Sequence, residues 1–196
     1  MLDVKNVSKT FAKGTVNEHI ALEKINLHLD RGEFLTIVGS NGAGKSTLFN
    51  LICGTFMQDS GTVTLDGQDI SFLPEHRRAK LIGRVFQDPM KGTAPNMTIE
   101  ENLALANRRG KSRGLRPGIT SQERDLFRAQ LAALGLGLEN RLTSKVGLLS
   151  GGQRQALTLL MATLNQPKLL LLDEHTAALD PKTADKVLQL TEEIAA

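Results

Sequence analysis

The stretch GSNGAGKST, residues 39–47, constrains the fold of this 196-residue chain more than any other segment. It fits the pattern G-x-x-x-x-G-K-[S/T], and it stands between an apolar segment, FLTIV at 34–38, and a helical pattern that ends near Gly54. Glycines let the backbone curl so that successive N–H groups face one anion, and the following helix presents its positive end to the same place. The stretch therefore predicts a strand, a phosphate-binding loop (P-loop) and a helix in immediate succession.

The side chains of this loop suit a nucleotide with magnesium. Lys45 is expected to contact the outer phosphates, and the Ser46 hydroxyl is expected to ligate Mg²⁺. A chance glycine-rich turn is the competing interpretation, and the strand-loop-helix setting disfavours it. The residues expected to surround the phosphates of the nucleotide are Gly39, Ser40, Asn41, Gly42, Ala43, Gly44, Lys45, Ser46 and Thr47.

A second motif, the acidic stretch KLLLLDEHTAALD, supplies the carboxylates that a phosphate-binding loop with Mg²⁺ needs. Four consecutive leucines, 169–172, predict a buried strand whose end carries Asp173 and Glu174. Asp173 is expected in the Mg²⁺ shell, and Glu174 beside the γ-phosphate as the general base or water-orienting group. Two acidic residues at an ordinary strand end are the alternative, which the P-loop makes less favourable.

Composition excludes several classes of protein. The 24 basic and 21 acidic residues give a net charge of +3, too small to indicate a nucleic-acid binder. Cys53 is the only cysteine, so an internal disulfide framework is excluded. No run approaches the roughly 18 apolar residues of a membrane span, and the N-terminus lacks the apolar region of a secretory signal, so a cytosolic chain is expected.

The order of patterns predicts a single domain over 1–196 with three parts. Residues 1–87 read as a β subdomain and the P-loop core, 88–150 as a mostly helical insert, and 151–196 as a return to the core. The expected strands are LDVKNV (2–7), the alternating INLHL (25–29), a buried FLTIV (34–38), GTVTL followed by a tight Asp66-Gly67 turn, LIGRVFQ (81–87) and the leucine strand.

The helical insert carries its own start signals. Thr98 with Glu101 and Thr120 with Glu123 each have the spacing of a capping box ahead of a helix. The basic stretch NRRGKSRGLRPG, 107–118, is either a solvated loop or a docking patch for acidic groups. A further helix is expected after SGGQ, and Asp180 has the position of an N-cap for a last helix.

With these motifs in order, the sequence resembles the nucleotide-binding subunits of ATP-binding cassette (ABC) transporters over its whole length. The resemblance is carried by the P-loop, VFQDP with Gln87, LSGGQ at 149–153, LLLLDE, and ALD at 178–180. It implies an α/β fold: a RecA-like P-loop NTPase core with a mixed or parallel sheet and flanking helices, an N-terminal antiparallel β subdomain and a helical insert.

The resemblance also assigns roles to single residues. Phe11 falls where an aromatic stacks on adenine, although a core role is equally open. Gln87 matches the glutamine that reaches Mg²⁺ and lies beside the membrane subunits, and Asp180 matches the aspartate that links the two sites of a dimer. The signature residues, expected to bind the ATP held by a partner subunit, are Ser150, Gly151, Gly152 and Gln153.

The implied activity is ATP hydrolysis that powers the transport of a solute, with uptake favoured over export. The implied partners are a second ATP-binding subunit, in a homodimer or heterodimer, integral membrane permease subunits and an extracytoplasmic solute-binding protein. The chain would then lie peripherally on the inner face of the cell membrane and bind no nucleic acid. The alternative is a non-transport ATPase of the superfamily acting on DNA or the ribosome; the sequence lacks the sustained heptads of the DNA type.

Some positions depart from the family pattern. The switch histidine expected beyond Asp180 has no counterpart before Ala196, which predicts a truncated subunit with weak hydrolysis. His175 beside Glu174 is a disfavoured substitute. Ala156 and Met161 stand where relatives commonly carry arginine, and Ala177 stands where they frequently carry serine.

Overall fold

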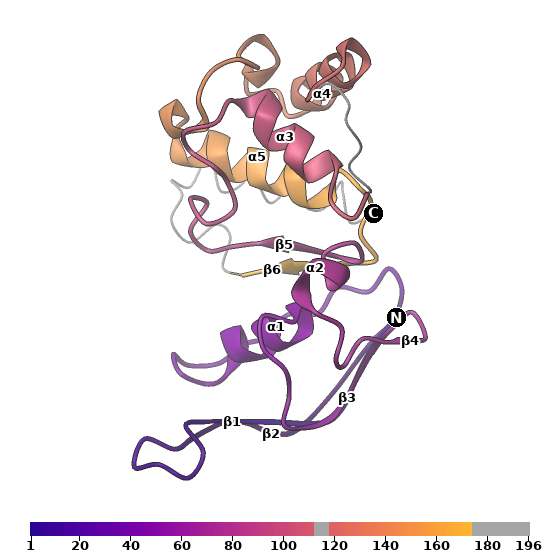
Figure 1. Cartoon of the computed structure of the whole chain (residues 1–196), viewed down its shortest axis with the longest axis vertical. Coiled ribbons are helices and arrows are strands. Elements are labelled where there is room, and N and C mark those ends of the chain that lie inside the picture. The colour runs from indigo at the N-terminus through magenta and orange to yellow at the C-terminus, as the bar shows by residue number, and fades with distance from the viewer. Residues whose placement is uncertain (112–117, 174–196) are drawn as a thin grey trace. The chain divides into compact units, whose positions relative to one another are not determined.

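The computed structural model describes residues 1–111 and 118–173 and divides into two compact units. The first is Met1–Ile82 and the second begins at Gly83 (Figure 1). Within the described part of the chain, no helix has both the length and the apolar character needed to cross a membrane.

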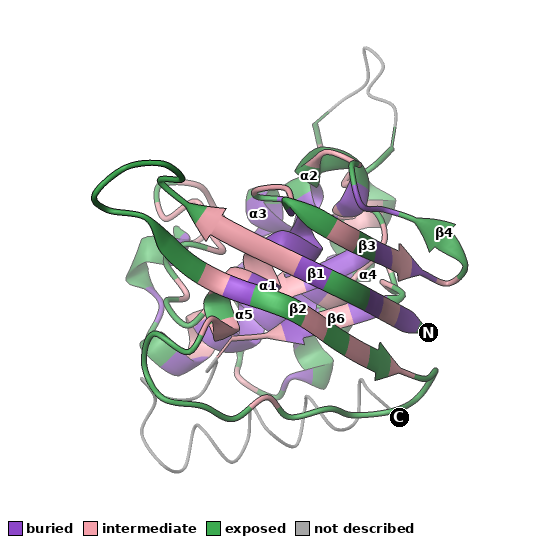
Figure 2. Cartoon of the chain, turned by 90° about the horizontal axis from the view of Figure 1, so that it is seen from below, coloured by how far each residue is buried: buried purple, intermediate pink, exposed green. Residues whose placement is uncertain are grey.

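The first unit is built on an antiparallel sheet. Its strands are β1 (Leu2–Phe11), β2 (His19–Leu29), β3 (Ser60–Leu65) and β4 (Gln68–Asp69), in the order β2-β1-β3-β4. Central β1 pairs Val4 with Leu27 on one side and with Val63 on the other. The strands expected at 2–7, 25–29 and in GTVTL are confirmed. The alternation predicted for 25–29 is confirmed too, since half-buried and exposed residues alternate along this part of β2 (Figure 2).

The expected turn between β3 and β4 is present. Asp66 and Gly67 both have positive φ, 54° and 78°, and the flanking Leu65 and Gln68 are paired. Two consecutive left-handed residues are the geometry of the hairpin turn that Asp-Gly favours. Local sequence therefore sets this connection.

Helix α1 (Lys45–Cys53) follows the P-loop as predicted and buries Leu48, Leu51 and Ile52. It ends at Gly54, whose φ of 82° lies in the left-handed region. Left-handed glycine is the commonest way to end a helix because no Cβ opposes the conformation. A short helix, α2 (Glu75–Arg78), which the sequence patterns did not predict, follows β4.

The prediction of a buried strand at 34–38 is wrong. These residues have no strand assignment, and Phe34 and Val38 are 72% and 89% exposed. A strand buried on both faces takes its hydrogen bonds and its cover from chain segments distant in sequence. No described strand is paired with 34–38, so apolar composition alone does not make this segment a strand.

The described residues of the second unit form two strands and three α-helices. Strand β5 (Ile82–Val85), which begins at the boundary residue Ile82, pairs with β6 (Leu169–Leu172). The helices are α3 (Ile99–Asn107), α4 (Ser121–Ala133) and α5 (Gly151–Thr163), with 3₁₀ turns at Leu138–Asn140 and Val146–Leu148. Their shared core includes Val85, Leu103, Phe127, Leu131, Leu157 and Leu159, all fully buried.

Both predicted capping boxes are confirmed. The Thr98 hydroxyl accepts from the Glu101 N–H at 3.2 Å, and the Thr120 hydroxyl accepts from the Glu123 N–H at 3.2 Å. Each glutamate carboxylate accepts in return from the N–H of its threonine, at 2.7 and 2.8 Å. These local bonds fix where α3 and α4 begin.

A titrating pair joins β1 to β2. His28 Nδ1 lies 2.7 Å from Asp3 Oδ1, and this hydrogen bond is the main cause that raises the pKa of His28 and lowers the pKa of Asp3. The histidine contribution is present below its unfolded pKa of 6.5 and is lost as pH rises through the raised folded pKa. The aspartate contribution is present above 3.8 and is lost as pH falls through the lowered folded pKa.

We therefore expect the chain to lose thermal stability as pH rises from 6.5 through the raised folded pKa of His28, and His28→Gln to flatten that loss because the titrating proton is removed. The melting temperature at each pH measures this. His76→Gln, at an exposed position of α2, is the matched control and should leave the slope unchanged. An unchanged slope in His28→Gln would contradict the assignment.

Candidate nucleotide-binding site

In the first unit, the P-loop runs from Gly39 into the start of α1. Lys45 Nζ donates to the carbonyl oxygens of Gly39 and Ser40, the latter at 3.1 Å, so the ammonium lies across its own loop. The Ala43 N–H donates to the Ser40 carbonyl at 3.2 Å, which closes a turn inside the loop. The loop therefore brings Lys45 and Ser46 to one exposed edge of this unit.

Gly44 is the N-cap of α1 and provides no side-chain cap. The first N–H groups of a helix have no partner within the helix, and here they follow a loop that is itself exposed. No acidic side chain occupies the first turn of α1. The positive end of the helix and the adjacent ammonium are thus suited to bind an anion.

Phe11, the candidate adenine-stacking residue, ends β1. It is 37% exposed and meets Phe56 edge-on, with ring centroids 5.2 Å apart and an interplanar angle of 86°. Lys9 Nζ lies 5.7 Å from the centroid of the Phe11 ring. The ring is held from one side and keeps exposed surface, as stacking would require.

In the second unit, Asp173 lies directly after β6. Its N–H donates to the Val85 carbonyl at 3.1 Å, which ties it to the end of β5. Its carboxylate lies 3.8 Å from Arg84 Nη2, and the Arg84 guanidinium stacks on the Phe86 ring at 4.4 Å. Sequence reasoning missed Arg84, because only the pairing of β5 with β6 brings it beside Asp173.

Gln87 is exposed, two residues beyond the end of β5. Strand β5, which precedes Gln87, is paired with β6, which precedes Asp173. Both candidate Mg²⁺ contacts therefore follow neighbouring strands. No group of three metal-ligating His, Cys, Asp or Glu side chains occurs among residues 1–111 and 118–173. A carboxylate, a serine hydroxyl and substrate phosphates are each oxygen donors that Mg²⁺ accepts, so the chemistry of each candidate residue suits the metal.

The signature residues open α5. The Ser150 hydroxyl accepts from the Gln153 N–H at 3.2 Å, and Gln153 Oε1 accepts from the Ser150 N–H at 3.2 Å. The S-x-x-Q spacing is the sequence signal for this capping box, which was not among the predicted capping boxes. Because Ser150 Oγ acts as the cap acceptor, its O–H proton stays available to donate to an anion.

Arg154 holds the turn that precedes the signature residues. Its Nη2 donates to the carbonyls of Gly147 and Leu149 at 3.2 and 3.1 Å, and Nη1 lies 2.7 Å from the Met90 sulfur. The guanidinium therefore fixes the turn that precedes Ser150. No local pattern in the sequence indicated this role.

The structure thus groups the candidate residues by unit. The P-loop and Phe11 belong to the first, whereas Gln87, Asp173 and the signature belong to the second. The predictions for Glu174, His175, Ala177 and Asp180 lie outside the described residues.

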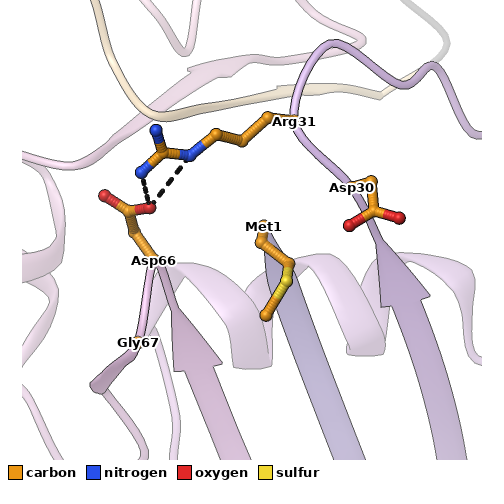
Figure 3. A pocket seen from close by; sticks show the side chains of 5 residues that line it. All are labelled: Met1, Asp30, Arg31, Asp66 and Gly67. Carbon is orange, nitrogen blue, oxygen red and sulfur yellow. Dashed lines mark hydrogen bonds and ion pairs between the residues drawn. The ribbon is translucent and has the colours of Figure 1, made fainter.

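A surface pocket of about 510 Å³ in the first unit contains none of the candidate residues. It is lined by Met1, Asp30, Arg31, Asp66 and Gly67 (Figure 3). Arg31 reaches across it to the Asp66 carboxylate, with Nε 3.1 Å from Oδ1. The pair braces the end of β2 against the β3–β4 turn, which is a structural role.

A phosphate-binding loop that leads into a helix, a carboxylate directly after a strand and a capped SGGQ helix are the combination that ABC-type P-loop ATPases carry. The family described as "ABC transporter" matches residues 22–177. The chain belongs to this family and is one of its ATPases.

Three similar proteins illustrate the match. The "Tyrosine transport ATP-binding protein" of Clostridioides difficile is 46% identical over 99% of this chain and 77% of its own length. The "Spermidine/putrescine import ATP-binding protein PotA" of Pasteurella multocida is 37% identical over 93% of this chain and 45% of its own. The ATP-binding cassette MJ0796, solved as a dimer in a post-hydrolysis state with ADP and Pi, has a TM-score of 0.83 and 34% identity, covering 100% of this chain and 83% of that one.

The two glycines near the start of α1 give a matched test of the loop. Both have a φ of 85°, but a Cβ at Gly44 would lie 2.6 Å from the Ala21 carbonyl oxygen, whereas at Gly42 it would meet nothing within 4 Å. We expect Gly42→Ala to lower the free energy of unfolding by about 1 kcal/mol. Gly44→Ala should cost about 1 to 3 kcal/mol more, because the sheet must move. Urea unfolding measures both, and equal losses would contradict this packing.

Proposed function

We propose that the chain is the ATPase of an uptake transporter and that it uses Mg²⁺-ATP. The P-loop entering α1 is the observation that carries the nucleotide site, because it combines exposed helix N–H groups with Lys45. The import and transport names of two similar proteins support uptake. The tyrosine transport protein makes amino acids the first solutes to test, although partner subunits would select the solute.

In this proposal the P-loop binds the phosphates through the backbone of 39–47, with Lys45 on the outer phosphates. Phe11 stacks on the adenine. Ser46, Asp173 and Gln87 hold the Mg²⁺, which would neutralise charge developing on the phosphates. Glu174 orients or deprotonates the attacking water.

The signature acts on the nucleotide of a second subunit. The Ser150 proton, the exposed Gly151 backbone and the N-terminal dipole of α5 together form an anion receptor without a cation. Two chains would therefore close head to tail around two ATP molecules, with Gln153 and Asp180 at the junction. Loss of the γ-phosphate would weaken this closure and convert hydrolysis into movement.

The partners proposed are a like or related ATP-binding subunit, permease subunits and an extracytoplasmic solute-binding protein. The chain would then lie on the inner face of the membrane, held by the permease. The competing role, action on DNA or the ribosome, is not favoured, because the named relatives are transport proteins.

The phosphate assignment predicts that Lys45→Ala abolishes measurable ATP binding, since the outer phosphates lose their cation. Fluorescence titration with a labelled ATP measures this. Lys80→Ala, at an exposed lysine of the same unit, is the control and should bind normally. Undiminished affinity in Lys45→Ala would remove the P-loop from the proposed function.

The signature assignment predicts that Ser150→Arg spares ATP binding at low protein concentration but prevents dimerisation. Light scattering with Mg²⁺-ATP in a Glu174→Gln background, which should slow hydrolysis and hold the closed state, measures the dimer. Ser150→Ala isolates the loss of the helix cap, worth about 1 kcal/mol of stability. Loss of ATP binding by the dilute Ser150→Arg monomer would show that the loop serves its own site.

A further inference from the structure

Arg78 is a buried cation, and no carboxylate of residues 1–111 and 118–173 forms an ion pair with it. Its side chain is fully buried, and none of the ion pairs among the described residues includes it. Burial lowers its pKa, and the charge of Asp69 opposes that effect only in part. An arginine stays charged in proteins, so the cost of desolvation must be offset by hydrogen bonds.

The guanidinium donates four short hydrogen bonds to backbone carbonyls. Nη1 donates to Leu51 at 2.7 Å and to Ile52 at 3.0 Å, Nη2 to Ser71 at 2.9 Å, and Nε to Leu73 at 2.7 Å. Two of the acceptors are on α1, and the other two are in the segment leading to α2. Arg78 lies 27 and 26 residues after its two acceptors on α1, so it joins parts of the chain that are distant in sequence.

The two α1 carbonyls lie in the last turn of the helix that follows the P-loop. The negative end of a helix is stabilised by a cation, and α1 has no basic residue of its own in its last turn. Arg78 supplies that cation from α2. A helix of nine residues is roughly 13 Å long, so Arg78 and Lys45 hold opposite ends of one short rigid element.

Gly54 provides the space for this contact. A Cβ at Gly54 would lie 2.8 Å from Arg78 Nε and 3.1 Å from Cζ. The residue that ends α1 in the left-handed conformation is therefore also the residue against which the guanidinium packs.

We propose that Arg78 is a positioning residue of the phosphate site: it fixes α1 from its C-terminal end, so that Lys45 and the first N–H groups of the helix face the phosphates. The inference rests on the proposed nucleotide site. Its distinctive consequence is that the effect of Arg78 on affinity increases with the number of phosphates in the ligand, because only the phosphates meet the N-terminal end of α1.

The test compares the binding of ATP, ADP and AMP to the wild-type chain, Arg78→Met and Arg78→Lys by competition with a fluorescent ATP. Arg78→Met should weaken ATP by about tenfold, the size of a partly buried helix-terminus interaction, and weaken AMP by less than about twofold. Arg78→Lys keeps the charge and three donors, so it should recover part of the ATP affinity. Arg77→Met, at the adjacent exposed arginine, should behave as the wild type.

Each outcome is decisive. If Arg78→Met does not fold, the comparison of Arg78→Lys with the wild type carries the test, since it should still weaken ATP more than AMP. Equal weakening of all three nucleotides, or undiminished ATP affinity in folded Arg78 variants, would overturn the positioning role and leave a structural one. Failure of the wild-type chain to bind ATP would instead overturn the proposed function itself.

Discussion

The candidate phosphate site depends on how α1 is held. Its N-terminal N–H groups follow an exposed loop, its apolar face packs into the first unit, and its C-terminal carbonyls accept hydrogen bonds from Arg78. A helix N-terminus binds an anion through its free N–H groups and its dipole, so contacts that hold the helix in place also hold those groups in place. Arg78 at the C-terminal end of α1 and the exposed N–H groups at its N-terminal end therefore act together in the proposed phosphate site.

The second unit repeats this use of a helix N-terminus with different supports. Helix α5 begins with a Ser150–Gln153 capping box, and Arg154 fixes the carbonyls of the turn before it. Arg154 binds carbonyls that precede Ser150, and Ser150 itself stays exposed. In the P-loop, by contrast, Lys45 is itself one of the candidate phosphate-binding residues. In the proposed function these are two differently built anion receptors in one chain, and the second of them would bind the nucleotide of a partner subunit.

Features that depend on a few adjacent residues could be predicted from the sequence. The Asp66-Gly67 turn, the Thr98 and Thr120 capping boxes and the glycine end of α1 all arise from local bonds and backbone preferences. The strand expected at 34–38 failed because a buried strand needs partners distant in sequence. The contacts of Arg78, Arg84 and Arg154 were missed for the same reason: each guanidinium acts on backbone or carboxylate groups that only folding brings near.

By itself the sequence determined the chemistry: the order of P-loop, glutamine, SGGQ and carboxylate strand indicated an ATPase of the ABC transporter family, which the family match confirmed. Tertiary structure decided how those residues are supported. It set the Arg78 cation against the carbonyls of α1, and it placed Arg84 beside Asp173 through the pairing of β5 with β6. Motif residues contact the ligand directly and lie at short, defined spacings, so the sequence alone reveals them. The residues that position them come from segments that pack against the motif only in the folded chain, so no local spacing indicates them.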